Sequence, residues 1–423
     1  MPQENKKKER VKKMIKFGKW VVKFRIPILI LSFLLLIPTG IIYMNTRINY
    51  DILSYLPGDI ETMKGQDILL DEFGTGAFSV AVIDGMQEKE ISQLEDKLKE
   101  IDHVKDVLWY GALADISIPM DMLPDDLKDS LQNADTGSQL MIITFDTSMS
   151  ADETLDAIEE IRGLTNEQCL LSGMSAVVTD IKKICNSEVI MYVVIAAGLS
   201  ALVLALTMDS FLLPFIFLLS IGMAIVYNLG TNFIAGEISF VTQALAAVLQ
   251  LAVTMDYSIF LWHSYLENQE RYPDDKKRAM SHAISQTLTS VVGSSITTIA
   301  GFLAMCFMTF TLGMDLGIVM AKGVVFGVVG CVTILPAMIL AMDKWIEKTR
   351  HKAIIPDLGR IGGFVTKHYW IFIILFLVII GPAFYGQNHN QVYYDLVGTL
   401  PDNLESVNAG KRAIGEHLKR LGV

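Results

Sequence analysis

The chain has 423 residues, 52% of them hydrophobic, and a mean hydropathy of +0.42. These values are typical of a membrane protein and argue against a soluble globular one. The formal net charge of −11 gives no support to nucleic-acid binding by the chain as a whole.

Seven apolar runs are long enough to span a membrane as helices, which takes about 20 residues each. A soluble core explains one such run but not seven. The first run lacks a small-residue cleavage site, so we interpret it as an uncleaved span rather than a secretory signal. The predicted spans are residues 26–44, 189–207, 211–229, 238–263, 288–310, 316–342 and 370–385.

The charges around the first span predict the orientation of the chain. Residues 1–25 contain ten Lys or Arg and two Glu, whereas residues 45–187 contain ten Lys or Arg and 28 Asp or Glu. Because Lys and Arg accumulate on cytoplasmic flanks, we expect the basic N-terminus inside and residues 45–187 outside. The rest divides into five spans within 188–342, a cytoplasmic linker at 343–369, a seventh span at 370–385 and a truncated second external domain at 386–423.

Short strands alternate with amphipathic helices in the external segment. Strand, helix and strand follow one another twice, which is the split βαβ, ferredoxin-like pattern. The second helix is predicted to begin with a capping box from Ser150 to Glu153. Strands are predicted at 77–84, 104–110, 139–146 and 168–171, helices at 87–101 and 151–163, and an insertion between the two units.

Four cysteines are present, and none has the spacing of a metal site. Cys169 and Cys185 both fall on the outer side, where a disulfide bond between them can be neither assigned nor excluded from sequence. Cys306 and Cys331 lie within spans and are interpreted as small apolar residues.

The fourth span contains Asp256, and an ionised carboxylate in a bilayer interior costs several kcal/mol. Such a group is therefore a functional candidate, and burial favours its protonated form, as a proton carrier requires. We predict that Asp256 carries protons. A structural Asp tied to a neighbouring helix is the alternative.

Polar residues accompany Asp256 on the fourth span and its neighbour. Gln250, Thr254 and Tyr257 recur at helical spacing together with Gln243, and small or hydroxylated residues form one face of the fifth span. Such residues permit close helix packing and hydrogen bonds between helices. We expect a relay role for Tyr257, and with less support for Thr298. The packing face consists of Gln250, Ser290, Ser294, Thr297 and Gly301.

Lys322 lies in the sixth span, about six residues from its outer end, whereas Asp256 lies about eighteen residues from the outer end of its own span. The two side chains are therefore expected at different depths. We predict that Lys322 extends to the outer interface near Asp315.

The chain also repeats itself after 344 residues, without a gap, from about residue 18 to residue 61. Each copy has a basic stretch, an apolar run with a late proline and a Tyr-Asp…Leu-Pro segment. Repeats around membrane spans are typical of transporters with two related halves. The identical pairs include Gly18/Gly362, Pro38/Pro382, Tyr50/Tyr394, Asp51/Asp395, Pro57/Pro401 and Glu61/Glu405.

Several motifs resemble the resistance-nodulation-division (RND) superfamily, and most closely its mycobacterial-membrane-protein-large (MMPL) branch. They are Asp256-Tyr257-Ser-Ile-Phe, Ser294-Ser-Ile-Thr-Thr-Ile-Ala-Gly-Phe-Leu-Ala304, Leu312-Gly-Met-Asp-Leu-Gly317, Leu335-Pro336 and Ser172-Gly-Met-Ser-Ala176 with Asp180. The resemblance implies an RND-type six-helix half plus a seventh span, with residues 45–187 as a porter domain.

The resemblance further implies proton-driven export of lipids, hydrophobic drugs or other amphiphiles across a bacterial plasma membrane, with Asp256 and Tyr257 as relay and with no cofactor, metal or enzymatic activity. The partners would be protons and a lipid or amphiphilic substrate, which we expect to be taken up near residues 50–57 and 173–185. The protein partner would be the missing C-terminal half, a second half-transporter or another copy of this chain. A non-transporting lipid sensor or scaffold and a protein-export auxiliary are the alternatives. No phosphate-binding loop indicates an ATP-driven pump.

Overall fold

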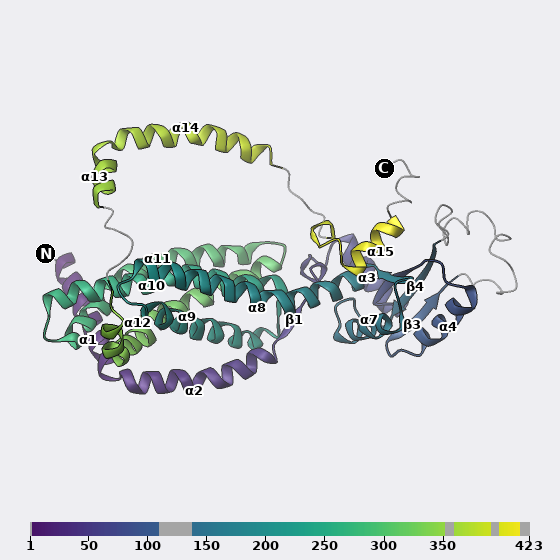
Figure 1. Ribbon diagram of the computed structural model, residues 1–423, viewed down its shortest axis with the longest axis horizontal. Coiled ribbons are helices and arrows are strands. Elements are labelled where there is room, and N and C mark those ends of the chain that lie inside the picture. The colour runs from purple at the N-terminus through teal and green to yellow at the C-terminus, as the bar shows by residue number, and fades with distance from the viewer. Residues whose placement is uncertain (1, 110–137, 352–358, 391–396, 415–423) are drawn as a thin grey trace.

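The computed structural model describes residues 2–109, 138–351, 359–390 and 397–414. A bundle of long helices lies at one end of the molecule and a smaller domain of strands and helices at the other (Figure 1). Helix α8, Met174–Thr207, runs from the smaller domain into the bundle and connects the two.

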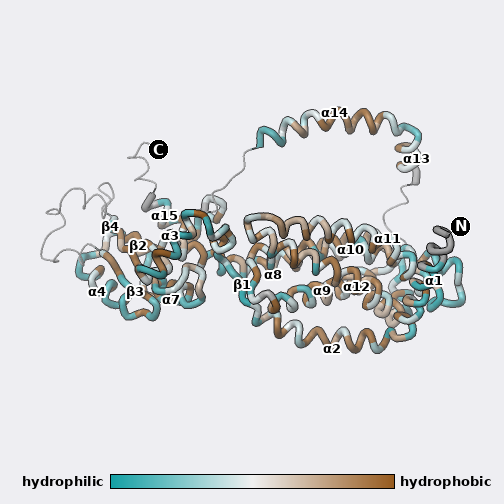
Figure 2. Tube along the Cα trace, turned by 180° about the vertical axis from the view of Figure 1, so that it is seen from behind, coloured by the Kyte–Doolittle hydropathy of each residue, from teal (hydrophilic) through white to brown (hydrophobic). Residues whose placement is uncertain are grey.

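Seven helices of the described chain are long and apolar enough to cross a membrane, and each contains one of the predicted apolar runs or most of it. Four of them extend well beyond the predicted limits, because a helix continues past its apolar run into polar turns. Figure 2 shows how strongly hydrophobic residues concentrate in these helices. They are α2 (Arg25–Met44), α8, α9 (Leu213–Gly230), α10 (Phe240–Arg271), α11 (Lys276–Ala304), α12 (Leu312–Lys348) and α14 (Tyr369–Asn388).

Helix α12 is the central element of the bundle and contacts α9, α10 and α11. Two glycines allow α10 to approach it closely. A Cβ atom on Gly327 would lie 2.0 Å from Thr254 Cγ2, and one on Gly323 would lie 2.9 Å from Gln250 Oε1. Small residues at such contacts let helices pack where lipid provides no hydrophobic driving force between them.

The basic N-terminal segment is itself a helix, α1 (Pro2–Lys23), which lies along α11. Gly18 makes this contact possible, because a Cβ atom there would lie only 2.4 Å from the carbonyl oxygen of Ser281. Val21 and Val22 are buried beside it in the bundle core. The helical conformation is interrupted at Phe24, and α2 begins at the next residue.

The smaller domain contains one antiparallel sheet of four strands in the order β3-β4-β2-β5. The predicted alternation of strands and helices is observed. Ile91, Leu98, Phe145 and Ile158 pack in its core, because alternate strand residues and one stripe of each helix are apolar. The elements are β2 (Ala77–Ile83), α4 (Glu88–Lys99), β3 (Val104–Leu108), β4 (Gln139–Phe145), α7 (Asp152–Leu164) and β5 (Cys169–Ser172).

Two local expectations for this domain are corrected or settled by the structure. The capping box predicted at Ser150 is wrong: the N-cap of α7 is Ala151, because a turn from Ser148 to Ala151 leads the chain into the helix. Cys169 and Cys185 are both free thiols and belong to different hydrophobic clusters. The predicted insertion, which contains residues 124–131, lies outside the described residues.

The sequence repeat is also a repeat of secondary structure. Helices α2 and α14 have bounds that differ by 344 residues at both ends. The same shift relates the 3-10 turns η1 (Leu53–Tyr55) and η5 (Val397–Thr399), and it aligns the first residue of α3 (Glu61–Asp71) with that of α15 (Glu405–Ile414). The break before α2 also recurs, since α13 (Gly359–Lys367) ends just before His368.

A short parallel ladder joins the first copy to the bundle. Strand β1 (Arg47–Asn49) pairs with β6 (Glu237–Ser239), which leads directly into α10. The C-terminal end of α2 is thereby fixed next to the N-terminal end of α10, the helix that carries Asp256.

Candidate functional site

Asp256 lies on the exposed side of α10, away from the helices that pack against it. Its side chain is exposed, on a stripe that also contains Ala252 and Phe260. Among the residues that the structure describes, its carboxylate has no hydrogen-bond or ion-pair partner. It is the one charged residue of α10 between Phe240 and Trp262. An unpaired carboxylate at this depth requires a proton, water or a covering protein surface.

The N-terminal end of α10 is anchored, which fixes the direction in which its side chains point. Asp315 of α12 accepts hydrogen bonds from the Ser239 amide at 2.9 Å and from Thr242 Oγ1 at 2.6 Å. Ser239 in turn caps the helix by accepting from the Val241 amide. A carboxylate at a helix N-terminus also interacts favourably with the helix dipole.

Tyr257 lies on another side of the same helix. Its side chain is 7% exposed and packs in the bundle core, and Cys331 Sγ donates to its carbonyl oxygen at 3.2 Å. Adjacent residues on a helix point about 100° apart. No hydrogen bond joins Tyr257 to Asp256 among the described residues, so the structure does not bring the two predicted relay groups together.

The polar stripe on α10 is buried inside the bundle rather than placed beside Asp256. Gln250 accepts from Asn228 Nδ2 at 3.0 Å, and Thr254 Oγ1 donates to the Gln250 carbonyl at 2.6 Å. Both lie against the glycines of α12 described above. Gln243 points elsewhere and donates to the Tyr43 hydroxyl of α2.

The hydroxylated face of α11 does not pack against that stripe. Ser294, Thr297 and Gly301 are exposed and Thr298 is half-buried. The hydroxyl groups donate to carbonyls of their own helix, and a Cβ atom on Gly301 would meet nothing within 4 Å. In the described part of the chain this face is therefore uncovered, as is Asp256.

Lys322 extends toward the end of the bundle where α12 begins, near Asp315, as predicted. Its ammonium group donates to Asn232 Oδ1 in the 3-10 turn η3 (Thr231–Ala235), which follows the C-terminal end of α9. Asp315 lies nearby and lines the same cavity. The structure therefore separates Lys322 from Asp256.

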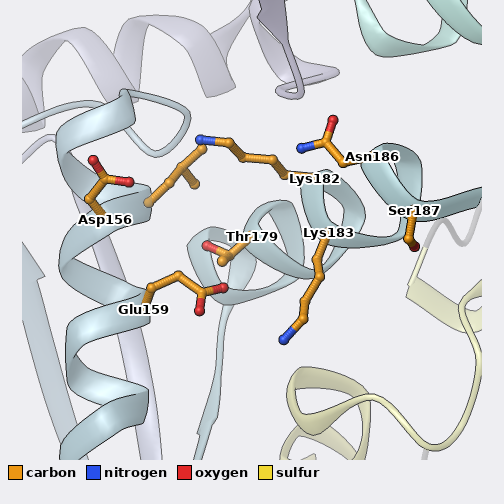
Figure 3. A pocket seen from close by; sticks show the side chains of 8 residues that line it. Asp156, Glu159, Thr179, Lys182, Lys183, Asn186 and Ser187 are labelled. Atoms are coloured by element: carbon orange, nitrogen blue, oxygen red, sulfur yellow. The ribbon is translucent and has the colours of Figure 1, made fainter.

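Two cavities adjoin the segments where we expected substrate entry. One, of about 520 Å³, lies between α3 and the sheet and is lined by Leu53, Ile68, Phe78 and Met174 among others. The other, of about 440 Å³, lies between α7 and α8. Figure 3 shows that α7 supplies Asp156 and Glu159 to it, and α8 supplies Thr179, Lys182, Lys183, Asn186 and Ser187.

The profile of the MMPL family matches residues 74–368, which is well over half of the chain. The chain belongs to the MMPL family. This confirms the resemblance recognised in the sequence motifs.

Two relatives of this MMPL protein are much longer than the chain. The probable transport protein MmpL12 of Mycobacterium tuberculosis is 24% identical over 366 residues, which are 83% of this chain and 30% of that protein. The putative membrane protein SCO5905 of Streptomyces coelicolor is 25% identical over 239 residues, which are 54% of this chain and 28% of that protein. The chain thus spans less than a third of their length. A crystal structure of SecDF in its super-membrane-facing form matches 77% of this chain and 39% of its own, with 14% identity and a TM-score of 0.41.

One ionic cluster of this MMPL protein was not recognised from the sequence. Arg162 of α7 contacts Asp180 of α8 at 2.8 Å and Glu405 of α15 at 3.1 Å, and Ser406 Oγ donates to Asp180 at 2.5 Å. The signal that was available is an Arg and an Asp in adjoining amphipathic helices. Their further partners, Glu405 for Arg162 and Ser406 for Asp180, lie more than 220 residues further along the chain, where no local pattern indicates them.

Proposed function

We propose that this MMPL protein is half of a proton-driven exporter of lipids or other amphiphiles in a plasma membrane, acting with a second half that covers the exposed face of α10 and α11. Asp256 carries the proton, and Tyr257 and Thr298 have lesser roles. The observation that carries the proposal is the unpaired carboxylate of Asp256, exposed on a helix that is otherwise uncharged across the bilayer.

The exposed position of Asp256 supports a second half as partner. A carboxylate that faces lipid is costly, whereas one at an interface between two bundles can exchange protons with water and with groups on the opposite helix. The uncovered Ser294, Thr297 and Gly301 fit the same interface, because small and hydroxylated residues permit close approach.

The outer domain supports the export of amphiphiles. The strand order β3-β4-β2-β5 supports a ferredoxin-like fold, and we propose that residues 45–187 act as a porter domain on the extracytoplasmic side. The cavity of about 520 Å³ beside α3 has an apolar lining, as a site for acyl chains needs.

A dye-efflux assay tests the coupling. Cells that express the protein are loaded with Nile red, and extrusion is followed with and without a protonophore. We expect extrusion by the wild type that stops with the protonophore, and a loss of about tenfold or more in Asp256→Asn, which keeps shape but cannot titrate. Tyr257→Phe should give a partial loss.

Glu267→Gln is the matched control, because Glu267 lies on the exposed side of the same helix but pairs with Arg271 in the last turns of α10. It should extrude dye like the wild type. Immunoblots of membranes check that all variants are present in equal amounts. Extrusion by Asp256→Asn at the wild-type rate would show that Asp256 is structural.

The proposed orientation has its own test. An impermeant thiol reagent applied to intact cells should label a cysteine introduced at exposed Asp102, in the outer domain, and should not label one introduced at Lys276. The reverse pattern of labelling would overturn the topology.

A further inference from the structure

A third cavity lies at the outer end of the bundle, away from Asp256. The cavity has a volume of about 710 Å³ and lies between η3 and α12, with Tyr55 of η1 at its rim. Ile234, Ile318 and Val325 line it and are 78%, 48% and 47% exposed. Ile318 and Val325 are seven residues apart, so they form one apolar stripe on the outside of α12.

Two hydrogen-bond donors converge in this cavity without enough acceptors. Asn232 is only 2% exposed, and its Oδ1 accepts from the Lys322 ammonium. Its Nδ2 has no hydrogen-bond partner among the described residues. A lysine ammonium has three N–H donors, of which Asn232 takes one. Buried donors without acceptors are rare in native proteins, so this pair indicates a missing acceptor.

Two carboxylates line the cavity and accept hydrogen bonds from other groups. Asp315 accepts with Oδ2 from both Ser239 and Thr242 at the start of α10. Glu237 accepts from Asn49 Nδ2 at 3.0 Å, and its other oxygen lies 3.8 Å from Arg47 Nε. Among the described residues, neither carboxylate accepts a hydrogen bond from Lys322 or from Asn232 Nδ2. These donors therefore remain available to a ligand.

We propose that this cavity binds a phospholipid of the outer leaflet. Its phosphate oxygens accept from Lys322 and from Asn232 Nδ2, and one acyl chain lies along Ile318 and Val325. The chemistry fits because phosphate offers only acceptors, to which an ammonium group binds strongly, and the apolar stripe leads from the donors into the bilayer. The proposal rests on membrane insertion and does not depend on proton-driven export.

The test measures lipid binding to the full chain. The protein is purified in detergent, stripped of lipid and titrated with dioleoyl phosphatidylglycerol, and bound lipid is counted by native mass spectrometry. Dioleoylglycerol has the same chains without the phosphate and should bind about tenfold or more weakly, which corresponds to about 1.4 kcal/mol. Excess inorganic phosphate should not displace the lipid, because it lacks the chains.

Variants assign the binding to the cavity. Lys322→Met and Asn232→Leu should each weaken phosphatidylglycerol binding, Lys322→Met by about tenfold or more. Lys322→Arg should retain it. Lys276→Met is the matched control, since Lys276 pairs with Asp343 and Glu347 at the other end of the bundle. Size-exclusion profiles check that each variant is folded.

Three results would overturn the proposal. Equal binding of the phospholipid and the diacylglycerol would exclude the phosphate contact. Wild-type affinity in Lys322→Met, which keeps an unbranched apolar side chain and is expected to fold, would exclude this cavity. Displacement of the lipid by inorganic phosphate would indicate a site for the free anion.

Discussion

The two copies of the repeat have the same secondary structure but opposite surroundings. In the first copy, α2 lies against α9 and α12, and a Cβ atom on Gly230 of α9 would lie 2.3 Å from the Thr39 carbonyl of α2. In the second copy, none of α14 is buried, and it lies apart from the bundle (Figure 1).

The helices that follow the spans show the reverse. Helix α15, of the second copy, packs on β5 and α8, with Ser406 and Val407 buried. Helix α3, of the first copy, has exposed apolar residues at Ile68, Leu69 and Leu70. In the first copy the long helix is packed and the helix after it is exposed, and in the second copy the reverse holds. Since both copies have the same sequence pattern, the difference comes from the neighbouring elements that each copy contacts.

The largest expected effect concerns the cluster that fixes α15. Arg162→Ala should destabilise the outer domain by about 3–5 kcal/mol, because Asp180, 4% exposed, is left buried without its cation. Hydrogen exchange of the amides of β5 and α15 measures this as faster opening.

Lys411→Ala is the control for Arg162→Ala. Lys411 pairs with Asp402 on the surface, and such pairs contribute about 0–1 kcal/mol. Unchanged exchange in Arg162→Ala would mean that α15 is docked by its apolar contacts alone.

The second prediction compares equivalent residues of the two copies. Glu405 accepts from the Leu171 amide at 2.9 Å, which covers the edge strand β5, whereas its equivalent Glu61 is exposed. Glu405→Ala should cost about 2 kcal/mol or more, because it removes a hydrogen bond to a charged group and one of the two carboxylates paired with Arg162. Glu61→Ala should leave unfolding unchanged. Equal effects in the same exchange experiment would contradict the contrast drawn above.

The third prediction uses the glycines at the start of each copy. Gly18→Val should force α1 away from Ser281 and destabilise the bundle by about 1–3 kcal/mol, as overpacking does. Gly362→Val, at the equivalent position of α13, has open space and should be neutral. The thermal unfolding of the detergent-solubilised chain measures both. A neutral Gly18→Val would show that α1 contributes little to the bundle.

The smallest effect is a pH dependence in the Tyr-Asp segment. Burial raises the pKa of Asp51, and the hydrogen bond from the Leu53 amide opposes this only in part. A raised folded-state pKa means that stability is highest below the ordinary pKa of the carboxyl group and falls as pH rises through the raised value. Asp51→Asn should abolish this decline, which begins above the ordinary carboxyl pKa of about 4.

Asp59→Asn, an exposed neighbour in the same segment, is the control and should keep the wild-type pH profile. Unfolding temperatures of the outer domain, recorded across the pH range, make the comparison. A profile for Asp51→Asn that matches the wild type would assign the pH dependence to other groups. Asp395, the equivalent of Asp51, lies outside the described residues.

Sequence patterns were sufficient to predict the helices and strands of this fold and the direction of one side chain, that of Lys322. Apolar run length identified the spans, strand alternation identified the order of the outer domain, and the depth of Lys322 in its span indicated that it extends outward. Each of these depends on local spacing, which a single sequence contains.

The arrangement around Asp256 could not be predicted in the same way. Spacing placed Gln250 and Thr254 on one face, but it could not show that this face meets Gly323 and Gly327 while Asp256 points away from the bundle. Helix rotation is decided by contacts between distant segments, such as that of Asp315 with the start of α10. The link from Arg162 to Glu405 was missed for the same reason.

The docking of α15 also bears on the order in which the chain folds. The bond between Leu171 and Glu405 joins residues 234 positions apart, and six predicted spans are synthesised between them. The ribosome therefore releases β5 and its exposed edge long before the helix that covers it. Contacts between residues so far apart in the sequence form late and slowly during folding. The outer domain thus reaches its final packing only after α8 to α14 have been made, which couples its maturation to membrane insertion of the bundle.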